Sequence, residues 1–136
     1  PTKDVLFYCF VFYAIKAINN DSTAAGIAIN LLDQCKRAPG VDSIYIKEWF
    51  VNDGLGIKKK AELSNGGEER RRVYGTISTY KHPGDARITL DCGLEVFFKP
   101  SVKGITEANL HNNVSCLIGF SYDGIRAWDE SVKLEE

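Results

Sequence analysis

The sequence predicts an α+β domain in which an antiparallel twisted sheet of about five or six strands packs against one main helix. Three observations support this fold class: one amphipathic stretch with helical spacing, several stretches in which apolar and polar residues alternate, and turn residues between those stretches. Consecutive strands joined by tight turns are typical of antiparallel sheets, and one amphipathic helix can cover a face of such a sheet.

The main helix is expected over residues 22–37. Asp21 or Ser22 can cap its first turn, and Pro39 and Gly40 end it. Its apolar residues recur three or four positions apart, which is the spacing of one helical face. These residues are Ala24, Ile27, Ala28, Leu31, Leu32 and Cys35. Small residues near its start predict that this helix approaches the sheet closely.

The apolar run 5–15 (VLFYCFVFYAI) is expected to be the first strand, because its aromatic residues suit a pleated surface. It is shorter than the roughly 20 residues that a membrane-spanning helix needs. No basic stretch precedes it, as a signal peptide would require. The chain opens at Pro1 and contains no methionine, so we expect a processed protein or a trimmed core.

Further strands are expected over 43–51, 72–81, 88–98, 114–122 and from residue 125 to 128. The strongest signal is in 88–98, where apolar residues occupy every even position and mostly polar residues the odd ones. Turn residues separate the strands at 52–54, 82–85 and 123–124. These elements make up a single domain over 1–136, a length that can bury one core.

The segment 58–72 (KKKAELSNGGEERRR) carries an unusual concentration of positive charge. Its six cations and three glutamates leave a net charge of +3, whereas the whole chain has a formal net charge of -1. Any binding to a polyanion must therefore come from a local patch. We predict a flexible charged loop over 58–71 that contacts an anionic membrane or a nucleocapsid. The candidate residues are Lys58, Lys59, Lys60, Arg70, Arg71 and Arg72.

Residues suited to catalysis or metal binding are scarce. The two histidines, His82 and His111, lie in a turn and in a polar link, and no acid–base pair or nucleophile with a base is evident. The four cysteines are far apart and form no metal-binding motif. We expect no enzyme activity and no cofactor. The cysteines are expected to be free thiols, although two disulfides in a secreted protein remain an alternative.

The C-terminal run NVSCLIGFSYDGIRAWDESVKLEE resembles the end of the lyssavirus matrix domain, where a strand with Cys leads through a turn to a strand with Trp and an acidic tail. In this sequence those positions are Cys116, Trp128, Glu135 and Glu136. The preceding LDCGLEVFFKP looks like the family's penultimate long strand. The opening order of strand, helix and strand over Val5 to Val51 also resembles the rhabdovirus matrix family.

This resemblance implies a non-enzymatic structural protein that self-associates and bridges the inner membrane leaflet and the viral nucleocapsid during assembly and budding. It implies a place in the virion beneath the envelope, and in the host cytoplasm at the inner membrane face, with no small-molecule substrate. The family's basic N-terminal arm and Pro-Pro-x-Tyr motif are absent from this sequence. Exposed Trp49 and Phe50 would supply subunit contacts; alternatively both pack under the helix.

A second hypothesis is a small ligand-binding domain of the nuclear-transport-factor-like or cystatin-like type. In such a domain a helix against an antiparallel sheet encloses an apolar pocket. The aromatic residues of the first apolar run could line this pocket. This hypothesis predicts a cavity of ligand size with one or two polar groups, whereas a filled core and concentration-dependent polymers would favour the matrix hypothesis.

Overall fold

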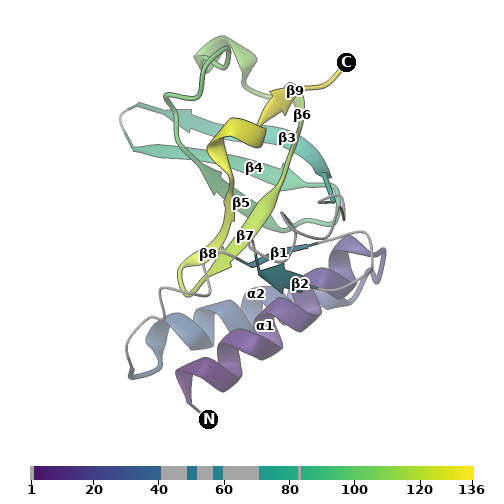
Figure 1. Cartoon of the computed structure of the whole chain (residues 1–136), viewed down its shortest axis with the longest axis vertical. Coiled ribbons are helices and arrows are strands. Elements are labelled where there is room, and N and C mark those ends of the chain that lie inside the picture. The colour runs from purple at the N-terminus through teal and green to yellow at the C-terminus, as the bar shows by residue number, and fades with distance from the viewer. Residues whose placement is uncertain (1, 41–48, 52–56, 60–70, 83) are drawn as a thin grey trace.

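The computed structural model describes residues 2–40, 49–51, 57–59, 71–82 and 84–136. Two helices form a layer at one end of the molecule, and a curled sheet occupies the other end (Figure 1). The buried apolar side chains of both parts form one hydrophobic core. The α+β class is confirmed at this level.

The first element is a helix, α1 (Lys3–Ile18), and the predicted strand over 5–15 is wrong. Thr2 caps the helix, since its Oγ1 accepts a hydrogen bond from the Val5 amide at 3.3 Å. Asp4 in the first turn and Lys16 in the last turn both complement the helix dipole. The aromatic composition favours a strand, but these end signals and the length of the run favour a helix. Packing of α1 against α2 and against the strands then overrides β-propensity.

The predicted main helix is confirmed as α2 (Ala24–Arg37), with Lys36 and Arg37 in its last turn. Its small residues Ala24, Ala25 and Ala28 are buried, as expected for a close approach. These small residues of α2 approach α1 and not the sheet, because the two helices pack along each other. The expectation that one helix covers the sheet is therefore corrected to a helical hairpin, in which α1 lies against the strands.

The described residues form a nine-stranded mixed sheet, with more strands than the five or six predicted. Its order is β2-β1-β7-β8-β5-β4-β3-β6-β9. Every described pairing is antiparallel except that of β5 with β8, which is parallel. The prediction of a purely antiparallel sheet is wrong because the chain crosses over between these two strands. The strands are β1 (Trp49–Val51), β2 (Ile57–Lys59), β3 (Val73–Lys81), β4 (Asp85–Leu90), β5 (Glu95–Phe98), β6 (Asn113–Cys116), β7 (Ile118–Ser121), β8 (Gly124–Ala127) and β9 (Lys133–Leu134).

Two of the predicted strands are each divided in two. The stretch 88–98 turns back at residues 91–94, where Leu90 N donates to Leu94 O at 2.8 Å and Gly93 has a φ of 100°. The period-two pattern continues through this hairpin and so does not reveal it. The stretch 114–122 breaks at Leu117 into β6 and β7. For the predicted strand 43–51 the structure describes only β1, and 43–48 lies outside the described residues.

The break at Leu117 allows the sheet to curl. Four strands separate β7 from β6 in the sheet order, yet Leu117 alone separates them in the chain. The sheet therefore bends until its two parts meet in one continuous segment, which is visible in Figure 1. Both sides of β6 and β7 are largely buried as a result.

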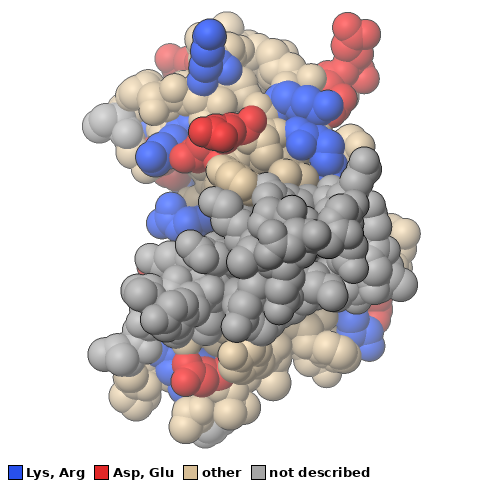
Figure 2. Space-filling view, in the orientation of Figure 1, with Lys and Arg blue, Asp and Glu red and all other residues tan. Residues whose placement is uncertain are grey.

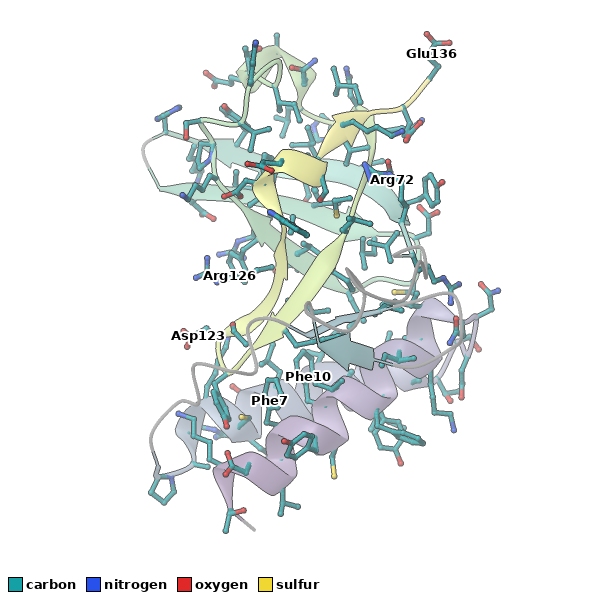
Figure 3. All side chains as sticks on the ribbon, in the orientation of Figure 1. Phe7, Phe10, Arg72, Asp123, Arg126 and Glu136 are labelled. Atoms are coloured by element: carbon teal, nitrogen blue, oxygen red, sulfur yellow. The ribbon has the colours of Figure 1, made fainter. Side chains whose placement is uncertain are left out.

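Aromatic contacts join the helical layer to the sheet. The ring centroids of Phe7 and Tyr122 lie 4.7 Å apart, and those of Phe10 and Phe120 lie 6.1 Å apart. The Tyr122 hydroxyl also donates a hydrogen bond to Asp4. In Figure 3 the labelled Phe7 and Phe10 side chains extend from α1 toward the strands. The inner side of α1 thus forms part of the domain core.

Candidate functional site

The outward side of α1 is also apolar. Val5, Tyr8 and Phe12 are 52%, 50% and 56% exposed, respectively. They share one side of the helix because they are spaced three and four residues apart. Lys16 borders this surface, with its Nζ 5.3 Å from the centroid of the Phe12 ring. We call this surface the α1 outer face.

An apolar surface on both sides of a helix indicates burial against more than one partner. The inner side of α1 meets the domain core, whereas the three side chains of the outer face are about half exposed. Exposed apolar side chains that gather on one surface are typical of protein–protein or membrane contacts. The sequence interpretation missed this face because it assigned a strand to 5–15, although the three- and four-residue spacing was the signal that could have revealed it.

The predicted basic segment is only partly within the described residues. Lys58 and Lys59 belong to β2, which pairs with β1, and nothing is described of their side chains. Lys60 and Arg70 lie outside the described residues. The prediction that these four residues contact a polyanion therefore stays a prediction. In Figure 2, basic and acidic side chains of the described residues lie interspersed on the visible face.

Arg71 and Arg72 are held by the folded domain. The Arg71 amide donates to Val51 O at 3.1 Å, and its guanidinium donates to the Asn19 side chain. Arg72 is half-buried between the sheet and the C-terminal segment, and Figure 3 labels its position. Its Nε donates to Ser115 Oγ at 3.0 Å, and its terminal nitrogen donates to the Ser131 carbonyl. Arg72 thus serves to join β3, β6 and the segment that leads into β9.

The environment of Arg72 also contains two further groups. Ser115 donates a hydrogen bond to the Glu135 carboxylate, so the arginine, the serine and the glutamate form a chain across β6. Cys116 is fully buried beside them, and burial raises the pKa of its thiol from 9.0 to about 12, with Arg72 opposing the shift. A thiol with this pKa is protonated at neutral pH and is a poor nucleophile.

Trp49 and Phe50 lie in β1, between β2 and β7 in the sheet order. Phe50 pairs with Gly119 of β7. Their side chains are outside the described residues, so the predicted role in subunit contacts stays a prediction, as does the alternative that they pack under the helix.

A groove of about 720 Å³ lies between α2 and the sheet, where it is bordered by β4, β5 and β8. We call it the α2 groove. Its lining combines apolar residues from α1, α2, β5, β8 and the turn before β5 with a few charged residues at the edge. A second hollow of about 380 Å³ lies between the α1–α2 link and β3, next to Arg71 and Arg72. The α2 groove is in the size range of small-molecule sites.

The groups that the sequence flagged for chemistry are dispersed. Among the described residues, no three His, Cys, Asp or Glu side chains come together as a metal site would require. His82 stacks edge-on near Tyr80 and His111 has a φ of 72° in a turn. None of the four cysteines forms a disulfide; Cys35 and Cys116 are buried, and the Cys35 thiol donates a hydrogen bond to Lys3 O at 3.6 Å. Within the part of the chain that is described, neither helix has the length and apolarity needed to cross a bilayer.

No protein-family model, no curated protein and no solved structure matches this chain. The resemblance to matrix proteins therefore rests on the sequence alone. Two of its parts are weakened by the fold, because the opening element is a helix and LDCGLEVFFKP spans a hairpin. In the C-terminal part Cys116 ends β6 and Trp128 follows β8, but β7 lies between these two strands and Trp128 is not in a strand, so the expected order of a Cys strand, a turn and a Trp strand is only partly met.

Proposed function

We propose that this chain is a non-enzymatic structural protein of the viral matrix type. In this role it associates with copies of itself and bridges an anionic membrane surface and a nucleocapsid. The observation that carries the proposal is the α1 outer face, an apolar surface on a helix that is already buried on its other side. The resemblance of the C-terminal run and the basic segment of the sequence add to it.

A second copy of the chain is the occupant proposed for the α1 outer face. Two copies related by a twofold axis present the same surface to each other, so one apolar helix face is sufficient for a self-complementary contact. A helix the length of α1 extends about 24 Å. Tyrosine and phenylalanine are enriched in the buried centres of such interfaces, and Tyr8 and Phe12 supply both types.

Replacing Tyr8 and Phe12 together by serine is expected to weaken self-association at least about tenfold. Sedimentation velocity over a range of protein concentrations measures this change. The matched control replaces Tyr74 and Leu134 by serine, because both are exposed apolar residues of the sheet. Equal association of the two double variants would remove the support for the α1 outer face.

Reversing Lys58, Lys59 and Lys60 to glutamate is expected to weaken binding to anionic liposomes at least about tenfold, since each basic residue near such a surface contributes about 1 kcal/mol. Arg71 and Arg72 are left intact because they hold the fold. Reversal of Lys81, Lys103 and Arg126 makes the same charge change elsewhere and serves as the control. Liposome flotation at rising salt provides the measurement, and similar loss in both triple variants would point to net charge instead of this segment.

A further inference from the structure

The α2 groove has the composition of a site for an amphipathic small molecule. Phe10, Leu94 and Ile125 are buried residues that contribute to its lining. Leu32 and Phe97 are half-buried and border it from α2 and β5. These side chains come from both helices, from the turn before β5, from β5 and from β8. An apolar ligand body could therefore contact the helical layer and the sheet at once.

Two glycines leave room in this groove. A Cβ placed on Gly26 or on Gly93 would have no atom within 4 Å. Gly26 lies one turn into α2, and both glycines line the groove. The space beside Gly26 is therefore available to a ligand, and equally to a larger side chain introduced there.

Some of the charged residues at the edge of the groove form ion pairs, and one does not. Arg87 contacts Asp85 and Glu95 at 3.0 Å and 3.2 Å. Asp33 contacts Arg37 at 2.9 Å. Lys36, by contrast, makes no ion pair or hydrogen bond with any residue that the structure describes. Lys36 is thus the cation that a ligand could neutralise.

The groove-lining residues of α2 place the free space beside Gly26 at one end of the groove and the charge of Lys36 at the other. Gly26, Ile29, Asn30, Asp33 and Lys36 all line the groove and follow helical spacing along one side of α2. Gly26 and Lys36 are about 15 Å apart along the helix axis. The amide of Asn30 lies between these two positions and can donate a hydrogen bond to a ligand.

We propose that the α2 groove binds a long-chain carboxylate, with its alkyl chain over Ile29, Leu32 and Phe97 and its carboxylate at Lys36. The groove volume is in the range of small-molecule sites, and each methylene that leaves water adds about fourfold to affinity. A carboxylate would pair with Lys36, the basic residue of the groove lining that makes no ion pair with the described residues. This binding activity does not depend on the matrix-type role.

The first test adds oleate to the full chain and measures binding by isothermal titration calorimetry, with native mass spectrometry for stoichiometry. Gly26→Leu fills the free space and is expected to weaken binding at least about tenfold. It should not unfold the protein, because leucine has a higher helix propensity than glycine. Gly84→Leu is the control, since Gly84 also has no atom near a Cβ and lies outside the groove. No binding of oleate by the wild-type chain, or equal affinity of the Gly26→Leu variant, would overturn the proposal.

The second test concerns the charge. Lys36→Glu is expected to weaken oleate binding at least about tenfold while leaving oleyl alcohol binding within about twofold. Lys103→Glu makes the same charge change at an exposed residue outside the groove and should leave both affinities unchanged. If Lys36→Glu weakens the alcohol as strongly as the carboxylate, the assigned orientation is wrong. Sedimentation of the same variants keeps this result separate from self-association, which should not change.

Discussion

Replacing Gly75 by alanine is expected to unfold the domain or to lower its stability by at least about 4 kcal/mol. Gly75 lies in β3, where it pairs with Leu90 of β4 on one side and with Val114 of β6 on the other. A Cβ at this position would lie 2.3 Å from Thr89 O and 2.8 Å from Leu90 Cα. Both neighbours are backbone atoms of a paired strand, so the clash is relieved only if the strands separate.

Urea denaturation followed by circular dichroism measures the effect of Gly75→Ala. The cost is large against the roughly 5–15 kcal/mol that stabilises a typical domain. Gly84→Ala is the matched control, because a Cβ there meets no atom within 4 Å. It should change stability by no more than about 0.5 kcal/mol. A Gly75→Ala variant as stable as the control would show that β3 and β4 are not paired in this register.

Phe10→Ala is expected to lower stability by about 3–5 kcal/mol. The Phe10 side chain is 1% exposed and contacts Phe7 and Phe120, so its removal leaves a cavity between the helical layer and the sheet. The lost contacts include those that join α1 to β7.

Phe12→Ala is the control for Phe10→Ala, since it makes the same chemical change on the outer side of the same helix. It should cost less than about 1 kcal/mol of stability in the single chain. Chemical denaturation at a concentration low enough to avoid association compares the two. If Phe12→Ala proved as destabilising as Phe10→Ala, the assignment of inner and outer sides to α1 would be wrong.

These two residues illustrate the separation of stability from function in α1. Phe10 belongs to the core, and Phe12 belongs to the surface proposed for self-association. The apolar composition of 5–15 was evident in the sequence, but a strand assignment would place neighbouring residues on alternate faces. The helix instead places residues three or four apart together, which creates the α1 outer face.

In the basic segment, too, the sequence shows the charges, whereas the fold decides which of them are held by other residues. Its charge is a property of the sequence, and the six cations look equivalent there. In the folded chain Arg72 donates hydrogen bonds to Ser115 and Ser131, which lie far from it in the sequence, and so contributes to the fold. Such a partner cannot be predicted from local pattern, because it depends on how the C-terminal segment returns to β6.

The sequence by itself determined the α+β class, the helix predicted over 22–37 and observed as Ala24–Arg37, the strand predicted over 72–81 and observed as Val73–Lys81, and the turn just before Gly124. Periodicity, caps and turn residues act over a few neighbouring positions, which is why the sequence reveals these elements. Only the tertiary structure decided which side of α1 is buried, that β5 pairs in parallel with β8, and that a groove opens beside α2. These features depend on contacts between segments distant in the chain, and residue pattern encodes local geometry without specifying which surfaces meet.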